Sequence, residues 1–188
     1  MSTWTSETAE WYARHYGEYA TNRLAVDALT FPLDAVIVDV GCGTGAALRH
    51  AAGRVTSGSL IGVDPVPRMV EIARERTANH PAGGRIEFRV GSAEALPLDD
   101  SSADYLLAFD SFDHWQDQAR GLDEVHRVLR PTGHFVVVKD GEVPGSAEDR
   151  KAFVAALTGA GFSIAREEKI AAEDVSFTLW ICTTEATD

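Results

Sequence analysis

Two hydrophobic periodicities alternate along the 188-residue chain. Short apolar runs, typical of strands, are separated by segments in which apolar positions recur every three or four residues, as on one face of a helix. Continuous apolar runs are typical of strands that a parallel sheet buries on both faces. The strand-like runs are residues 36–40, 60–63, 86–90, 105–109 and 135–138.

Helical patterns fill the intervals between these strands. Pro67 suits the first turn of a helix, and Pro131 is expected to end a helix whose apolar stripe closes at Leu129. Ser146 and Asp149 form a capping box that begins a later helix. The apolar stripes fall within residues 46–52, 67–73, 122–129 and 153–157.

This alternation predicts an α/β fold with a doubly wound, mostly parallel sheet. Residues 162–170 and 175–183 depart from it, because they indicate two strands joined by four residues, which should pair antiparallel. A helical segment broken at Gly17 precedes the first strand. We therefore expect a single domain, with an N-terminal helical cap over residues 1–32 and a core over residues 33–188.

Composition and charge limit the classes of molecule that this chain is expected to bind. Hydrophobic residues make up 45% of the chain and charged residues 24%, which are ordinary values for a globular domain. Seventeen basic and 29 acidic residues give a net charge of −12. Because such a chain repels phosphates, nucleic acids and membranes are not expected as partners. A neutral or cationic small molecule is favoured, and the oligomeric state is left open.

Cysteine usage and the N-terminus predict a cytoplasmic protein. Cys42 and Cys182 lie too far apart in the sequence to form a disulfide framework. The N-terminal residues include acids and no long apolar stretch, unlike a signal peptide. No apolar run approaches the roughly 18 residues that a membrane span needs. The histidines lack the spacing of metal ligands, so we expect no metal site.

The stretch VIVDVGCGTG, residues 36–45, carries the most chemical information. A strand leads into three alternate glycines, Gly41, Gly43 and Gly45, and then into a helix. Glycines allow positive φ angles and a close approach of a ligand to the backbone. Asp64 ends the next strand, where a carboxylate can accept two hydrogen bonds from a ribose diol. Together these features predict a nucleoside cofactor at the C-terminal edge of the sheet.

Two classes of cofactor fit this turn. Gly41, Gly43 and Ala46 satisfy the dinucleotide fingerprint, and the spacing to Asp64 does not discriminate between the classes. Asp39, two residues before the first glycine, suits a cationic cofactor better than a pyrophosphate. The terminal hairpin and the lack of a second domain for a hydride acceptor also disfavour a nicotinamide cofactor.

With these features the chain resembles a class I S-adenosylmethionine-dependent methyltransferase of the small-molecule, methyltransferase-domain-11 type. The resemblance implies a seven-stranded sheet in the order 3-2-1-4-5-7-6 with strand 7 antiparallel. It also implies S-adenosyl-L-methionine as the cofactor and in-line transfer of its methyl group to a small-molecule acceptor, mainly by positioning. It covers about residues 34–140, with motifs at residues 36–45, 62–74, 90–109, 113–115 and 122–138.

The resemblance also implies roles for individual residues. Asp39 would lie near the cofactor's amino group, and Asp64 would hold the ribose hydroxyls. Ser92 would meet the adenine edge, although the family commonly has a stronger, charged acceptor there. The cofactor-binding positions implied in this way are Asp39, Gly41, Cys42, Gly43, Gly45, Asp64, Pro65, Val66, Ser92, Ala93, Ala108 and Phe109.

Candidate catalytic residues follow the fourth strand. His114 is either a general base or substrate ligand, or a residue that caps its loop. Asp110 and Asp113 bind a substrate amine, orient His114, or are simply solvated, and the sequence leaves these alternatives open.

The N-terminal segment and the activity each leave alternatives open. Tyr12, Tyr16 and Tyr19 share one helical face, which predicts a helix docked by aromatic burial, or a lid over the site. The activity alternatives are a catalytically silent module that binds S-adenosylmethionine or S-adenosylhomocysteine, and a nicotinamide-dependent oxidoreductase.

Overall fold

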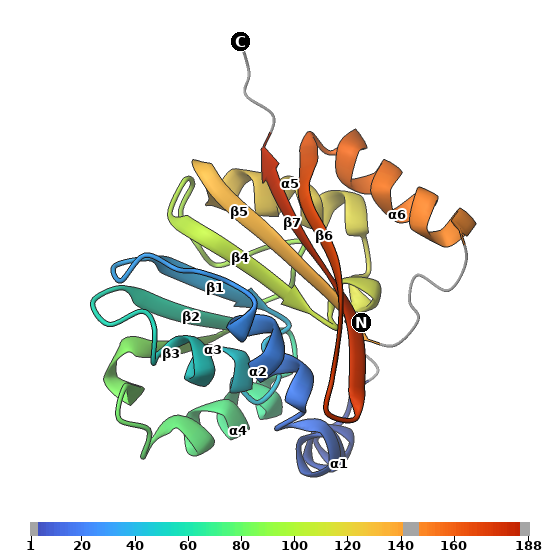
Figure 1. Ribbon diagram of the computed structural model, residues 1–188. Coiled ribbons are helices and arrows are strands. Elements are labelled where there is room, and N and C mark those ends of the chain that lie inside the picture. Colours follow the sequence, from blue (N-terminus) through green and yellow to red (C-terminus); the bar gives the residue numbers. More distant parts are fainter. Residues whose placement is uncertain (1–3, 141–146, 185–188) are drawn as a thin grey trace.

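A seven-stranded sheet forms the centre of the molecule, in the order β3-β2-β1-β4-β5-β7-β6 (Figure 1). The computed structural model describes residues 4–140 and 147–184. Strands β3, β2, β1, β4 and β5 are parallel, and β7 is antiparallel to β5 and to β6. The predicted fold class and strand order are confirmed. The strands are β1 (Val36–Val40), β2 (Ser59–Asp64), β3 (Ile86–Val90), β4 (Ala103–Phe109), β5 (Leu129–Asp140), β6 (Phe162–Ala172) and β7 (Val175–Thr184).

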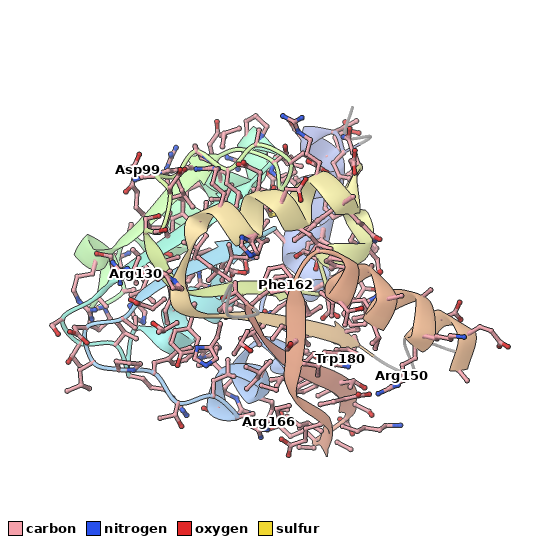
Figure 2. The ribbon with its side chains drawn as sticks, turned by 90° about the horizontal axis from the view of Figure 1, so that it is seen from above. Asp99, Arg130, Arg150, Phe162, Arg166 and Trp180 are labelled. Atoms are coloured by element: carbon pink, nitrogen blue, oxygen red, sulfur yellow. The ribbon has the colours of Figure 1, made fainter. Side chains whose placement is uncertain are left out.

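Helices cover both faces of the sheet. One apolar cluster joins α2, α3 and α4 to one face, and a second joins α5 and α6 to the other. Figure 2 views the molecule from the side of α5 and α6, where Arg150 of α6 pairs with Glu167 of β6. The helices are α1 (Ser6–Tyr16), α2 (Ala20–Asp27), α3 (Ala46–Ala51), α4 (Pro67–Thr77), η1 (Gly83–Arg85), η2 (Phe112–His114), α5 (Gln118–Val128) and α6 (Ala147–Gly159).

The buried face of each strand follows its sequence pattern. In β1, Ile37 packs toward α3, whereas Val38 and Val40 pack toward the α5 side, because successive side chains of a strand point to opposite faces. All three are fully or almost fully buried. At roughly 1.5–3 kcal/mol for each large apolar side chain, this two-sided burial is what holds β1 at the centre of the sheet.

The N-terminal helices pack against the first half of the core. The Thr5 hydroxyl caps α1 by accepting a hydrogen bond from the amide of Thr8. The α1 helix docks on α4, where the Arg68 guanidinium pairs with Glu10 at 2.7 Å. The chain leaves the helical conformation after Tyr16 and resumes it at Ala20, so the predicted break at Gly17 is confirmed.

Two boundary predictions are wrong. The α5 helix ends at Val128, and Leu129 opens β5 because it pairs with Ala103 of β4; Pro131 therefore lies inside a strand-like segment and does not end the helix. The C-terminal hairpin is also tighter than expected. Ala172 pairs with Val175, so two residues, not four, join β6 to β7. The capping residue Ser146 lies outside the described residues.

Candidate functional site

The glycine turn after β1 lies at the C-terminal edge of the sheet, between β2 and β4. The amides of Gly41 and Cys42 both donate to the carbonyl oxygen of Val63 in β2, at 2.7 and 3.1 Å. Gly41, Gly43 and Gly45 all have positive φ angles, between 52° and 79°. Strand order reverses at β1 and β4, which is where open α/β sheets bind their ligands.

The three glycines are needed for different reasons. A Cβ atom at Gly41 would lie 2.4 Å from Cβ of Ser111, and one at Gly45 would lie 2.6 Å from the ring of Phe88, so protein packing excludes a side chain at both positions. A Cβ atom at Gly43 would meet no protein atom within 4 Å. Gly43 therefore leaves open space above the turn that the protein itself does not fill.

Asp64, at the end of β2, is bonded to this turn. Its Oδ2 atom accepts the amide of Gly43 at 3.1 Å, and its Oδ1 atom accepts the amide of Val66 at 2.9 Å. Burial raises the pKa of Asp64 to about 6, although the two amides act against this shift. Each carboxylate oxygen can still accept a further hydrogen bond from a ligand.

A first cavity of about 310 Å³ opens beside Asp64. Its size lies within the range of small-molecule sites. It extends from the glycine turn to the β3–β4 connection, and Trp4 and Tyr12 of the N-terminal segment border it. The predicted site residues that line it are Gly41, Gly43, Asp64, Pro65, Val66, Ser92, Ala93, Phe109, Asp110 and His114.

A second cavity of about 400 Å³ adjoins the first. Tyr16 and Tyr19 line it on one side, and the ends of β4 and β5 line it on the other. Cys42 and Asp113 belong to this cavity. The residues that line both cavities are Tyr12, Gly41, Gly43, Phe109, Asp110 and His114. The two cavities therefore form one bipartite site that meets at the glycine turn and at the end of β4.

Three of the predicted positions do not line either cavity. Gly45 supports the turn from behind, against Phe88, and Ala108 is fully buried in the sheet. Asp39 lies below the turn and is 2% exposed. Burial and the neighbouring charge of Asp64 raise the pKa of Asp39 to about 7. Asp39 can thus act on a ligand through its charge, but its carboxylate does not line the site.

The loop after β4 is fastened to β5. Asp110 adopts a left-handed φ of 50°, and its carboxylate accepts the amide of Asp140 at 2.6 Å. Asp113 accepts a hydrogen bond from Nζ of Lys139 at 2.6 Å. The Lys139 ammonium also lies 4.5 Å from the ring centre of Phe153. These contacts fix the loop that carries His114 into both cavities.

Cys42 offers no reactive thiolate. Cys42 is 7% exposed, and its Sγ atom lies against Gly62 of β2. Burial, followed by the charges of Asp39 and Asp64, raises the pKa of this thiol well above its usual value. The described residues contain no group of three or more metal-ligating side chains. Nor does any described helix have the length and apolarity to cross a membrane.

A family model with the description "Methyltransferase domain" matches residues 38–137, which is just over half of the chain. The chain belongs to this family. The match spans the glycine turn, Asp64 and the loop of His114, and the strand order is that of the class I S-adenosylmethionine-dependent methyltransferases. Family membership therefore favours S-adenosylmethionine as the cofactor over a nicotinamide dinucleotide.

Several individual proteins are similar to this methyltransferase-family chain. It is 36% identical over 118 residues to the ubiquinone/menaquinone biosynthesis C-methyltransferase UbiE of Geotalea uraniireducens, covering 62% of this chain and 50% of that protein. It is 41% identical over 113 residues to an uncharacterized 37.1 kDa protein in transposon TN4556 of Streptomyces fradiae, covering 60% of this chain and 32% of that protein. The chain thus spans between a third and a half of the length of these curated relatives.

A solved structure shares the fold over almost the whole chain. It is a chain of the complex between the Haloferax volcanii Trm112 methyltransferase activator and its methyltransferase, with a TM-score of 0.76 and 23% identity. The superposition covers 95% of this chain and 97% of that one. At this identity the likeness concerns the fold, including the terminal β6–β7 hairpin that lies outside the matched family model.

Several residues that line the two cavities were not predicted as site residues from the sequence. Lys139 stands directly after the apolar run of β5, so the rule that ligands bind at the C-terminal ends of strands could have identified it. Tyr16 and Tyr19 were assigned mainly to docking of the helix, yet both line the second cavity. Glu94 and Trp115 of the first cavity lie within the motifs at residues 90–109 and 113–115, but no role was predicted for either, because only the folded chain brings their loops together.

Proposed function

We propose that this chain catalyses methyl transfer from S-adenosylmethionine to a small-molecule acceptor. The observation that carries the proposal is the bipartite site, in which two cavities meet at the glycine turn of a methyltransferase-family fold. One cavity has the elements that suit a nucleoside, and the other gives an acceptor access to the same junction. When bound, S-adenosylmethionine supplies a methyl group on a sulfonium ion, which leaves as a neutral thioether.

The residues of the first cavity suit the adenosine half of the cofactor. Asp64 is the acceptor for the ribose hydroxyls, since both of its oxygens are held in place by backbone amides. Ser92 and Ala93 lie at the far end of the cavity lining from the turn and are assigned to the adenine edge. The open space at Gly43, where a side chain would meet no protein atom, fits a ligand that passes closely over the backbone.

The chain's own residues align the acceptor and limit the access of water. Phe109 and His114 lie where the cavities meet, and Tyr12 faces both. Holding a nucleophile in line with a reactive methyl group can lower the barrier by about 7–11 kcal/mol without further chemistry. We assign catalysis mainly to this alignment, with His114 and Asp110 as the groups placed to accept a proton.

Calorimetric titration of the purified chain tests the cofactor, and a labelled methyl group tests the activity. We expect S-adenosylmethionine and S-adenosylhomocysteine to bind and NAD to give no heat. Binding of NAD alone would refute the proposal. Incubation with methyl-labelled S-adenosylmethionine and a set of small-molecule acceptors then tests transfer. Cofactor binding without transfer to any acceptor would favour the silent binding module instead.

A further inference from the structure

Four side chains surround the junction of the two cavities. Among the described residues, those that line both cavities are two glycines of the turn together with Tyr12, Phe109, Asp110 and His114. A methyl group that moves from the cofactor to an acceptor must pass between these side chains. Asp110 is the carboxylate among them. Whether it is ionised therefore decides which charge an acceptor can carry on the group that receives the methyl.

The Asp110 carboxylate is held rigidly. Its amide donates to the carbonyl oxygen of Val138 at 2.9 Å, and its Oδ1 atom accepts the amide of Asp140 at 2.6 Å. Its left-handed φ of 50° is uncommon for a residue other than glycine, and the bonds to β5 hold it in that conformation. Burial raises the pKa of Asp110 to about 6, so the group is still mostly ionised at neutral pH. The surface that it leaves open faces the two cavities.

Among the described residues that line the second cavity, the charged side chains other than Lys139 are acids. The one lysine of its lining, Lys139, is already neutralised by Asp113 at 2.6 Å and lies over the rings of Phe112 and Phe153. Asp110, by contrast, pairs with no lysine or arginine among the described residues of the lining. An anionic acceptor would be repelled here, and a cation would be attracted.

An aromatic wall faces these acids. Tyr12, Tyr16 and Tyr19 line the second cavity in succession, with ring centres 5.5 and 6.0 Å apart. Tyr16 is 43% exposed and Tyr19 38% exposed, although both are large aromatic residues. The faces of tyrosine rings attract cations within about 6 Å. A wall of this kind opposite a fixed carboxylate is suited to an ammonium group on a small apolar body.

We propose that the methyl acceptor is a small amine, which enters the second cavity as an ammonium ion, pairs with Asp110 and packs against the tyrosine wall. This inference rests on the proposed function, because it names the substrate class of the same site. A neutral alcohol of the same shape would lack the ion pair, and a carboxylate would be repelled by Asp110. Charge, more than shape, should therefore select the acceptor.

Asp110 then has a second role, as a proton acceptor. An ammonium nitrogen has no free electron pair, so one N–H proton must first pass to the Asp110 carboxylate. The freed pair forms the N–C bond as the methyl–sulfur bond breaks, and the sulfur keeps the electrons of that bond. The product is the methylated ammonium ion, and Asp110 returns its proton to water before the next turnover.

Three compounds of almost the same shape test the charge preference. Phenethylamine, 2-phenylethanol and phenylacetate are titrated calorimetrically into the chain saturated with S-adenosylhomocysteine, and benzylamine serves as a shorter amine. We expect an amine to bind at least tenfold more tightly than the alcohol, because a charge-assisted contact contributes about 1.5–3 kcal/mol. Phenylacetate should not bind. Methyl-labelled cofactor should then label the nitrogen of the amine that binds.

Asp110→Asn is the decisive variant, since an asparagine can still accept the amide of Asp140 and should preserve the loop. It should bind the amine and the alcohol equally when it is titrated at a concentration of S-adenosylhomocysteine that saturates the variant. Asp123→Asn, on the exposed surface of α5, is the matched control and should retain the preference. Equal binding of alcohol and amine by the unaltered chain, or no binding of either amine, overturns the inference. Failure to bind S-adenosylhomocysteine would instead refute the proposed function.

Discussion

The amide of Gly43 donates to Oδ2 of Asp64 at 3.1 Å, so the glycine turn after β1 and the acid after β2 form one unit. The same carboxylate accepts the amide of Val66 at the start of α4. A ligand that bonds to Asp64 is thereby placed over Gly43 as well. The bond also means that Asp64 has a structural role beyond any contact with a ribose.

Replacement of Asp64 should therefore reduce both affinity and stability. Asp64→Ala removes the acceptor of two backbone amides and, under the proposed function, of the ribose hydroxyls. At about 1.5–3 kcal/mol for charge-assisted bonds, the affinity for S-adenosylhomocysteine should fall about 10- to 100-fold or more. Thermal unfolding should also show a lower melting temperature, because the amides of Gly43 and Val66 lose their partner. Unchanged affinity in calorimetry would show that Asp64 does not contact the cofactor.

Gly43 and Gly84 separate the effect on the ligand from the effect on the fold. A Cβ atom at either position would meet no protein atom within 4 Å. Only Gly43 lines the cavities, and its positive φ adds about 1–2 kcal/mol of strain to an alanine. We expect Gly43→Ala to lose most of its affinity for S-adenosylhomocysteine, while Gly84→Ala binds normally. Equal affinities would indicate that the cofactor does not approach the turn.

The pKa values of Asp39 and Asp64 predict that cofactor binding and stability respond oppositely to pH. Both pKa values are raised above the usual 3.8, to about 7 and about 6. Raised carboxyl pKa values stabilise the ligand-free fold below about pH 4, and this contribution is lost as the pH rises through 6 and 7. A cationic cofactor favours the ionised carboxylates, so its affinity should rise over the same interval.

Calorimetry and thermal unfolding between pH 5 and 7.5 measure both effects. The ligand-free melting temperature should fall with rising pH. The affinity for S-adenosylmethionine, which carries the sulfonium charge, should increase by up to about tenfold for each unit by which the ligand lowers a pKa. Asp39→Asn removes the group with the higher pKa and should flatten both curves above pH 6. The pKa of Asp110 is also raised to about 6. The same two measurements on Asp110→Asn therefore separate the titration of Asp110 from that of Asp39 and Asp64. A pH-independent affinity would contradict the prediction.

Sequence patterns predicted the fold well because its determinants are local. The β-branched run of residues 36–40, the three glycines and Asp64 lie in short segments whose geometry follows from residue type. The ends of helices and strands were predicted less well where pairing between distant strands outweighs the local sequence pattern. Leu129 is an example, because it belongs to β5 through its pairing with Ala103 of β4.

The candidate site was predicted only in part: the positions around the glycine turn and Asp110, Asp113 and His114 of the second cavity were predicted, but most of the rest of that cavity was not. Side chains such as Tyr19 and Lys139 come from segments far apart in the sequence, and no spacing rule places them in one cavity. The buried state of Lys139 in particular depends on Phe112 and Phe153, which belong to two other elements. A lysine after a strand is ordinarily solvated, so its residue type alone predicted nothing about the site.

The ion pair between Lys139 and Asp113 should respond unequally to the loss of its two partners. The Lys139 side chain is 7% exposed, whereas that of Asp113 is 52% exposed. Asp113→Asn leaves a buried ammonium without its counter-charge and should cost about 1–3 kcal/mol in the free energy of unfolding. Lys139→Met replaces the buried stem with an apolar chain that can pack on Phe112 and Phe153, and it leaves Asp113 to water. Its cost should stay below about 1 kcal/mol, as measured by urea unfolding.

The double variant Lys139→Met/Asp113→Asn completes the comparison. Because the buried charge is absent, the double variant should be more stable than Asp113→Asn alone, which is a coupling that additive effects cannot produce. Lys139→Arg keeps the charge but not the shape, and its planar group should fit poorly between the two phenylalanine rings. If Lys139→Met proves more destabilising than Asp113→Asn, the ammonium is held mainly by the rings and the ion pair is not what fastens the loop of His114. In that case the packing of Phe112 on α6, and not the ion pair of Asp113, would position this loop.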